Sequence, residues 1–475
     1  MRQAVTPISR LFSVPHCDGD LVAAGAEREH DWMSFAHDVA NLAARIKQFG
    51  GRIWLVADTD AYALAVGLFA ALQAECQAML PANLQHGHLA DVAATADGVI
   101  SSANFLPDAK NRLQTFDPTA SGDISALHPL DPENREIILH TSGTTGAPIA
   151  VHKPLHCFES EIAAQTEAFA PRPGRMVLAT VPPYHIYGLL FRILWPLATE
   201  RPFSTELISY PEELVSAAEK NSGGMFVASP AFLKRALPVL PLVHLTNFLG
   251  PVISSGGPLS PTVAAAYNSV LSEPVREIYG STETGGIAYR SVMDSSAPAL
   301  WQPLPTVEVA VDSEEQVLAI RSPMLPGKGW FHTDDRVELH SDGRFELKGR
   351  SDRVVNVEEV RVSLPEVEQR LARCSTVEAA RVIALPGGNT ERQILAAVIE
   401  PSNAGWEVLA NEGRQEMRSL ILDALKPYFV SIVLPRKWRF VTRIPEDDRG
   451  KTSNAALAAL FDEDPGRSVE PVVVG

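Results

Sequence analysis

Residues 137–153 constrain the fold more than any other stretch of this chain. They begin with the apolar run Ile-Ile-Leu, which is typical of a buried strand. The sequence Thr-Ser-Gly-Thr-Thr-Gly follows at 141–146, with two conformationally permissive glycines and four hydroxyl groups. Backbone amides in such a loop can form a concave anion site. The stretch therefore predicts a strand leading into a polyphosphate-binding loop, although composition alone leaves an ordinary surface turn open.

The glycine spacing argues against the Walker loop of kinases and motor-type NTPases. That motif requires a glycine, four residues, and then Gly-Lys-Ser or Gly-Lys-Thr. Here Gly143 and Gly146 are too close together, and Pro148 and Ile149 follow the second glycine.

Strands and helices alternate along the first part of the chain, which predicts an α/β fold with a parallel sheet. A buried strand is expected at 52–57, an apolar helix at 61–76 with a cap from residues 58–60, and a further strand at 78–80. A strand is expected at 176–181, followed by an apolar helix over 182–197. Asp342 and Gly343 predict a hairpin turn between 337–339 and 345–347.

Length and charge restrict the class of protein. A chain of 475 residues is long enough for two or three domains. Its 57 acidic and 41 basic residues give a formal net charge of −16, which argues against nucleic acid or an anionic membrane as a partner. No apolar run is long enough to span a membrane, and the first twenty residues lack a secretory signal. The four scattered cysteines suggest neither a disulfide framework nor a zinc site, so a cytoplasmic location is expected.

The order Thr-Ser-Gly-Thr-Thr-Gly-Ala-Pro resembles the phosphate loop of the adenylate-forming superfamily, which contains acyl-CoA synthetases, peptide-synthetase adenylation domains and luciferases. Three further segments resemble signatures of that superfamily in the same order: Tyr-Gly-Ser-Thr-Glu at 279–283, Gly-Arg-Ser-Asp at 349–352, and the segment 445–451 that ends in Gly-Lys. The resemblance spans most of the chain, and a luciferase-type oxygenase shares the same fold.

The resemblance implies a nucleotide site. Tyr279 would offer a ring face to adenine, Asp335 would hold the ribose hydroxyls, and Arg350 would contact ribose and phosphate. Thr282 would contact the α-phosphate, and Glu283 would be the protein ligand of Mg²⁺. The implied ATP- and AMP-binding residues are Thr141, Ser142, Gly143, Thr144, Thr145, Gly146, Gly256, Gly257, Tyr279, Gly280, Ser281, Thr282, Asp335 and Arg350.

The resemblance also implies an acid-binding pocket and catalytic groups. The catalytic residues would be Lys451, which bridges the substrate carboxylate and the α-phosphate, together with Thr282 and His185. The acyl pocket would be formed by Tyr184, His185, Tyr187 and Gly256, with Gly257 as a further candidate. Without the resemblance, His185 would be read as a hydrogen-bonded buried histidine.

The resemblance implies two domains: a large N-terminal adenylation domain of layered β-sheets and helices at 1–349, and a small mobile α+β lid at 350–475 that carries Lys451. Asp352 would be the hinge. The implied function is ATP- and Mg²⁺-dependent activation of a carboxylic acid as an acyl-adenylate, followed by transfer to the pantetheine thiol of CoA or an acyl carrier protein. An aryl or short unsaturated acid is the favoured substrate.

Two departures from the superfamily pattern leave alternatives open. Ile149 takes the usual lysine position after the loop proline, and Lys153 is a candidate to replace its charge. In the lid, Asn356 takes a lysine position and Glu359 takes a glycine position beside the pantetheine channel, which puts CoA as acceptor in question. A catalytically impaired protein that binds adenylates for sensing or for a partner is the alternative function.

Overall fold

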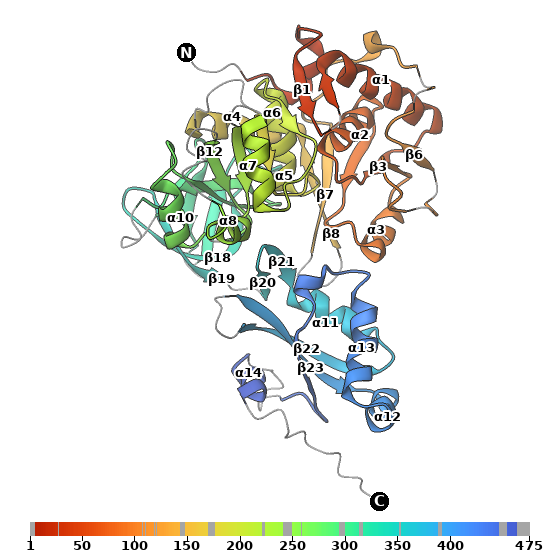
Figure 1. The fold of residues 1–475 in the computed structure, drawn as a ribbon, viewed down its shortest axis with the longest axis vertical. Coiled ribbons are helices and arrows are strands. Elements are labelled where there is room, and N and C mark those ends of the chain that lie inside the picture. Colours follow the sequence, from red (N-terminus) through yellow and green to blue (C-terminus); the bar gives the residue numbers. More distant parts are fainter. Residues whose placement is uncertain are drawn as a thin grey trace, which may run out of the picture. The chain divides into compact units, whose positions relative to one another are not determined.

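The computed structural model describes residues 5–462 except for positions 27, 107, 110, 118, 120, 143–147, 170–175, 221–223, 241–248, 258, 294–299, 313–316, 351–352, 388–391 and 446–453. The chain forms two compact units. The first contains residues 1–84, 89–141 and 150–351, and the second contains residues 85–88, 142–149 and 352–475. Figure 1 shows the elements of both units.

A six-stranded sheet has the order β6-β5-β3-β4-β7-β8. Its strands are β3 (Ile53–Val56), β4 (Gln77–Leu80), β5 (Gly98–Ser101), β6 (Arg112–Gln114), β7 (Glu136–Ser142) and β8 (Pro148–Pro154). The pairs β3–β4, β3–β5, β5–β6 and β4–β7 are parallel, as the alternation of strands and helices predicted. The apolar run at 137–139 lies in β7 and is buried.

Helix α1 (Trp32–Phe49) leads into β3, α2 (Ala61–Gln73) connects β3 to β4, and α3 (His86–Ala93) connects β4 to β5. Every residue of α2 is buried, which explains why its sequence is apolar all round rather than amphipathic. Asp60 caps α2 by accepting a hydrogen bond from the amide of Ala63 at 2.8 Å, which confirms the predicted capping segment. Short 3₁₀ turns lie at η1 (Ile8–Ser13) and η2 (Ile124–Ala126).

A nine-stranded sheet has the order β15-β14-β13-β12-β11-β9-β10-β1-β2. Its strands are β1 (Leu21–Ala24), β2 (Glu29–Asp31), β9 (Met176–Ala179), β10 (Phe203–Ser204), β11 (Gly224–Ala228), β12 (Leu249–Ser254), β13 (Arg276–Ser281), β14 (Gly285–Arg290) and β15 (Gln302–Pro303). The strands from β1 to β13 in this order pair in parallel, so β9, β11, β12 and β13 end at the same edge. That edge is where ligands usually bind in open α/β sheets.

Helix α4 (Leu155–Phe169) leads from β8 into β9, and α7 (Pro211–Lys220), α8 (Pro230–Ala236) and α10 (Pro261–Asn268) follow β10, β11 and β12. The apolar helix predicted over 182–197 is instead composite. It consists of α5 (Ile186–Gly188), a π-helical segment η3 (Leu189–Leu194) and α6 (Trp195–Ala198). The buried Arg192 in η3 donates to the carbonyls of Val181 at 3.1 Å and Thr205 at 2.8 Å.

The first unit also contains a four-stranded antiparallel sheet in the order β16-β17-β18-β19. Its strands are β16 (Glu308–Val311), β17 (Val317–Arg321), β18 (Phe331–Leu339) and β19 (Phe345–Arg350). The predicted hairpin is confirmed, because Leu339 pairs with Phe345 and the turn glycine Gly343 has φ +84°. Asp335 of β18 lies opposite Arg350 of β19.

The second unit is an α+β structure. A hairpin is formed by β20 (Val354–Val357) and β21 (Val360–Ser363), and a three-stranded sheet by β22 (Val377–Pro386), β23 (Gln393–Pro401) and β24 (Lys437–Phe440). Its helices are α11 (Leu364–Ala372), α12 (Asn403–Asn411), α13 (Arg414–Leu425) and α14 (Asn454–Asp462), with a 3₁₀ turn at η4 (Ser431–Val433). Leu371, Ile421 and Leu425 pack with Val382 and Ile399 in its core. In neither unit does a described helix have the length and apolar character needed to cross a membrane.

Candidate active site

Several of the predicted site residues of the first unit lie where strands of the nine-stranded sheet end. Gly256 and Gly257 follow β12, and Gly280 and Ser281 end β13. Tyr184 and His185 follow β9. Because β9, β12 and β13 run parallel within one sheet, the fold brings these three segments to one edge although they are far apart in the sequence.

The turn between β13 and β14 holds Thr282 and Glu283. Its backbone is fixed by Thr284, whose hydroxyl accepts a hydrogen bond from the amide of Ser281 at 2.9 Å and donates to the carbonyl of Gly285 at 2.8 Å. Gly285 has φ +69°, a conformation that favours glycine. A side chain at Gly280 would place its Cβ 2.1 Å from the carbonyl oxygen of Gly285. The Tyr-Gly-Ser-Thr-Glu sequence therefore fits a tight turn that leaves Thr282 and Glu283 partly exposed.

Tyr279 and Asp335 are brought into direct contact. The Tyr279 hydroxyl donates a hydrogen bond to Oδ2 of Asp335 at 2.6 Å, across 56 positions of sequence. The tyrosine ring also packs beside Trp301 and Phe345, with centroid distances of 5.4 Å and 5.9 Å. The predicted adenine and ribose residues are thus neighbours, and the bond between them was not predicted from the sequence. Their individual roles stay predictions.

A buried ion pair supports the glycine turn. Glu277 accepts hydrogen bonds from Arg290 at 3.1 Å and 2.9 Å, and it also accepts one from the amide of Leu259 at 3.2 Å. Gly256 has φ +90°, and a Cβ there would meet no neighbouring atom within 4 Å. The turn is therefore open on one side and tied to β13 on the other. Glu277 was not predicted as a site residue, although its position two residues before Tyr279 was a usable signal.

The predicted acyl-pocket residues occupy the segment after β9. The Tyr187 hydroxyl lies within hydrogen-bonding distance of the carbonyls of Ile253 (2.9 Å) and Ala228 (3.1 Å), which ties this segment to the ends of β12 and β11. A side chain at Gly188 would place its Cβ 1.9 Å from the carbonyl oxygen of Pro182, so the turn requires glycine. Tyr184 is half-buried, and burial raises the pKa of its phenol to about 12.

His185 is exposed to solvent, which rules out the buried histidine that the isolated residue would suggest. Its ring lies 5.0 Å from that of Tyr184. Desolvation by the surrounding protein lowers the pKa of His185 to about 4. The imidazole is therefore neutral at pH 7, so it can accept or donate a hydrogen bond but carries no positive charge.

Lys153 does not replace the missing charge at position 149. It is fully buried at the end of β8, and its Nζ donates to the carbonyl oxygens of Glu283 at 3.2 Å and Met324 at 3.0 Å. Burial lowers its pKa, an effect partly opposed by the negative charge of Glu161. Ile149 is 42% exposed. The lysine considered as a replacement for that charge therefore lies in the protein interior.

Several predicted residues cannot be compared with the structure. Gly143, Thr144, Thr145, Gly146, Asp352 and Lys451 lie outside the described residues. Ser142 and Arg350 belong to β7 and β19, but their side chains are outside the described part as well. Thr141 lies in β7 and is partly buried.

The donor set suits Mg²⁺ bound mainly by a substrate. Within the described residues, no cluster of three or more His, Cys, Asp or Glu side chains could enclose a metal ion. Mg²⁺ commonly uses one or two protein carboxylates together with water and phosphate oxygens. A single partly exposed carboxylate at Glu283 fits that pattern.

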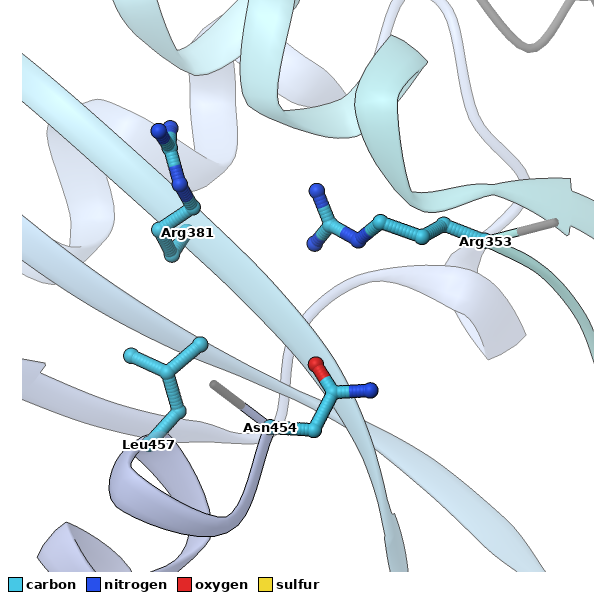
Figure 2. A pocket seen from close by; sticks show the side chains of 4 residues that line it. All are labelled: Arg353, Arg381, Asn454 and Leu457. Atoms are coloured by element: carbon cyan, nitrogen blue, oxygen red, sulfur yellow. The ribbon is translucent and has the colours of Figure 1, made fainter. Parts of the chain in front are cut away.

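A pocket of about 290 Å³ lies in the second unit and is lined by Arg353, Arg381, Asn454 and Leu457 (Figure 2). Arg353 donates to both carboxylate oxygens of Glu368, at 2.9 Å and 2.6 Å, and to the carbonyl of Val382 at 2.9 Å. The Arg353 guanidinium is therefore already ion-paired and hydrogen-bonded within the second unit. None of the predicted site residues is among the described lining of this pocket.

Curated relatives include several acid–thiol ligases. The 4-coumarate–CoA ligase of Rhodobacter capsulatus is 27% identical over 290 residues, which cover 58% of this chain and 66% of that protein. The 4-chlorobenzoate–CoA ligase of an Arthrobacter species is 24% identical over 69% of this chain and 66% of its own length. A fatty acid–[acyl-carrier-protein] ligase, ScoC of Streptomyces coeruleorubidus, is 25% identical over 72% of this chain and 70% of its own length. The matched part of this chain thus spans just under two thirds of the first two relatives.

Solved structures agree in fold. The amide bond synthetase McbA of Marinactinospora thermotolerans superposes with a TM-score of 0.76 at 20% identity, covering 95% of this chain and 99% of that one. A malonyl-CoA ligase with methylmalonyl-CoA and AMP bound superposes with a TM-score of 0.76 at 20% identity, covering 93% and 100%. This likeness confirms the predicted fold class. The sequence profile described as "AMP-binding enzyme" matches residues 54–328, more than half of the chain, so this protein belongs to the AMP-binding enzyme family and the predicted superfamily is confirmed.

Proposed function

We propose that this protein activates a carboxylic acid with ATP to form an acyl-adenylate and then transfers the acyl group to a pantetheine thiol. The observation that carries the proposal is the hydrogen bond between Tyr279 and Asp335 beside the Thr282–Glu283 turn. It joins the residue expected to hold adenine to the residue expected to hold ribose, close in sequence to the residues expected to hold phosphate. Tyr279, Thr282 and Glu283 lie inside the region 54–328 matched by the AMP-binding family, and Asp335 lies just beyond it.

In the first half-reaction an oxygen of the substrate carboxylate attacks the α-phosphorus of ATP. The new oxygen–phosphorus bond forms as the bond from the α-phosphorus to the bridging oxygen breaks, and pyrophosphate leaves with the electron pair. The protein acts mainly by positioning and charge stabilisation. Thr282 donates its hydroxyl to an α-phosphate oxygen, and Lys451 supplies a positive charge between the two reactants.

Glu283 is the protein ligand of Mg²⁺ in this proposal. The bound ion supplies neutralisation of negative charge on the phosphate oxygens. His185, expected at the acyl pocket, is neutral and adds no second positive charge there, so in this proposal Lys451 is the group that pairs with the carboxylate.

In the second half-reaction the thiol sulfur attacks the acyl carbon, and AMP leaves with the oxygen it received from the acid. The second unit moves about Asp352 between the two steps, which takes Lys451 away and admits the thiol. The acceptor is CoA or an acyl carrier protein, and relatives are named for both kinds of acceptor.

The substrate proposed is an aryl or short unsaturated acid. Tyr184 and Tyr187 supply flat ring surfaces in the expected pocket, and offset contacts between aromatic rings favour a flat acid over a flexible chain. Two of the relatives are named for 4-coumarate and 4-chlorobenzoate, which supports an aryl acid.

ATP–pyrophosphate exchange with Mg²⁺ across a panel of aryl and aliphatic acids tests the proposal. Exchange that depends on an acid, and that falls by about 1,000-fold in Lys451→Ala while ATP binding persists, would support adenylation. A folded protein that binds ATP but exchanges with no acid would overturn it in favour of a non-catalytic adenylate-binding protein.

A further inference from the structure

Two buried charged side chains contact the turn that carries Thr282 and Glu283. Lys153 and Glu161 are 0% and 3% exposed, respectively. They come from consecutive elements, the end of β8 and the body of α4, which directly follow the predicted phosphate loop in the sequence. Lysine and glutamate are rarely buried unless they are paired or hydrogen-bonded, so their presence here calls for a physical reason.

Lys153 binds backbone rather than substrate. Its Nζ donates to the carbonyl of Glu283 at 3.2 Å and to that of Met324 at 3.0 Å. Glu283 lies in the β13–β14 turn, and Met324 follows β17 of the four-stranded sheet whose next strand carries Asp335. One ammonium group therefore links the turn expected to hold phosphate with the sheet expected to hold ribose.

Glu161 fastens the other end of the same turn. Its Oε1 accepts a hydrogen bond from the amide of Gly286 at 2.7 Å. A Cβ at Gly285 would lie 2.6 Å from Oε2 of Glu161, so the carboxylate packs directly against the glycine backbone. Burial raises the pKa of the Glu161 carboxyl, and the charge of Lys153 and the hydrogen bond from Gly286 oppose that rise. The turn is thus fixed from inside at both Glu283 and Gly286.

We propose that Lys153 and Glu161 are positioning residues for adenylation. Lys153 holds the Thr282–Gly286 turn in place through the carbonyl of Glu283, and Glu161 does so through the amide of Gly286. The inference rests on the proposed function. It also gives a reason for the lysine at 153 in a chain that lacks the superfamily's lysine at 149. In this proposal the ammonium group of Lys153 supports the Thr282–Gly286 turn from the protein interior and does not contact phosphate from the loop.

The test is the pair Lys153→Met and Glu161→Gln in the full-length protein, with Leu72→Ala as the matched control. Leu72 is fully buried in α2, a helix that carries none of the site residues, so this control separates lost stability from a lost turn position. The three variants are compared at temperatures equally far below their own melting temperatures.

Lys153→Met is expected to lower kcat/KM for ATP in pyrophosphate exchange by about 100-fold, because a displacement of catalytic groups by about 1 Å costs that much. It is also expected to raise the Mg²⁺ concentration needed for half-maximal rate. Glu161→Gln keeps an oxygen for the Gly286 amide and is expected to cost about 5-fold. The double variant should lose less than the product of the two, since removing both charges leaves neither uncompensated.

Hydrogen exchange of the peptide 277–290 supplies a readout that does not depend on activity. Faster exchange of this peptide in Lys153→Met than in Leu72→Ala supports the proposal, even if the wild-type protein activates none of the acids tried. Equal exchange in the two variants, or equal loss of activity, would overturn it. If Lys153→Met does not fold, Glu161→Gln decides the question by the same two measurements.

Discussion

Two hairpin turns lie in segments that resemble superfamily signatures, and they differ in how strongly the surrounding protein supports them. The β13–β14 turn carries Thr282 and Glu283, and the fold fixes it with the buried Lys153, Glu161 and Thr284. The β20–β21 turn of the second unit consists of Glu358 and Glu359, since Val357 pairs directly with Val360. Glu359 is exposed, and Glu358 forms an ion pair with Arg392 at 3.3 Å.

The two turns also differ in how well their residues suit a positive φ angle. The first turn places glycine at position 285, where φ is +69°. The second places Glu358 at φ +55°, a conformation that costs energy for a residue with a side chain. The first turn thus combines a relaxed backbone with internal support, as expected for a site that must be accurate. The second has a strained backbone and an exposed surface, so its sequence can change with little effect on the fold.

The largest effect is expected at the first turn. Glu283→Gln keeps the backbone carbonyl that Lys153 binds but removes the carboxylate, so pyrophosphate exchange should fall by about 300-fold while stability changes by less than about 0.5 kcal/mol. Exchange assays at several Mg²⁺ concentrations and thermal denaturation check this. Glu308→Gln, which also removes one exposed carboxylate, is the charge-matched control. Equal activity of the two variants would remove Glu283 from the site.

Asp335 tests whether the contact beside the first turn recognises ribose. Asp335→Asn keeps an acceptor for the Tyr279 hydroxyl but weakens hydrogen bonds to the ribose, so the KM for ATP should rise by about 10-fold. The wild-type preference for ATP over 3′-deoxy-ATP should shrink in this variant. Tyr279→Phe is the companion variant, with an expected loss of about 3-fold. An unchanged preference in Asp335→Asn would show that the carboxylate only orients Tyr279 and does not bind the ribose.

The sequence predicted those helices and strands that a short stretch of residues determines. The apolar helix α2 and the buried strands β3, β4 and β7 followed from composition and order, because an element buried on all sides must be apolar throughout. The helix α12 and the π-helical segment at 189–194 were not predicted. A helix boundary or a π-bulge depends on packing that the local pattern does not encode.

The site residues likewise divide into those that a local sequence pattern predicts and those that depend on tertiary packing. The turn glycines and the Tyr-Gly-Ser-Thr-Glu segment were recognisable because each residue type is required at its own position. The Tyr279–Asp335 bond and the destination of Lys153 depend on how two sheets meet, which no short window of sequence reveals. The suggestion that Lys153 replaces the charge missing at position 149 was wrong for that reason. The predicted roles at 143–146 and Lys451 stay predictions.

An intermediate effect is expected in the helix that follows the second turn. Glu366 of α11 is 6% exposed, and burial raises the pKa of its carboxyl from 4.5 to about 7, partly opposed by Arg370. Between those values the folded protein keeps the proton while the unfolded chain loses it. The free energy of unfolding contributed by this group therefore falls as the pH rises through that window.

Glu366→Gln removes this dependence. At pH 8 the variant should be more stable than the wild-type protein by about 2 kcal/mol, and at pH 4 the two should be equal. Urea denaturation of the full chain at both pH values measures the difference, with the exposed Glu378→Gln as control. A constant difference at both pH values would show that Glu366 is not protonated in the folded state.

The smallest effect is expected at the second turn itself. Glu359→Gly restores the superfamily residue and should change pyrophosphate exchange by less than about 2-fold, because the side chain is exposed and belongs to the other unit. Thioester formation with CoA should rise by about 5-fold if this side chain hinders the thiol. Glu358→Gly relieves the positive φ without opening that position, and it is the matched control. A similar gain in both variants would point to turn flexibility instead.

The central claim is that the acid attacks the α-phosphorus of ATP, and oxygen transfer tests it most directly. The protein is incubated with ATP, Mg²⁺, CoA and an aryl acid labelled with ¹⁸O in both carboxylate oxygens, and the nucleotide and phosphate products are analysed by mass spectrometry. The account predicts one ¹⁸O atom in each AMP formed and none in pyrophosphate. Label in inorganic phosphate with release of ADP, or AMP without label, would contradict it.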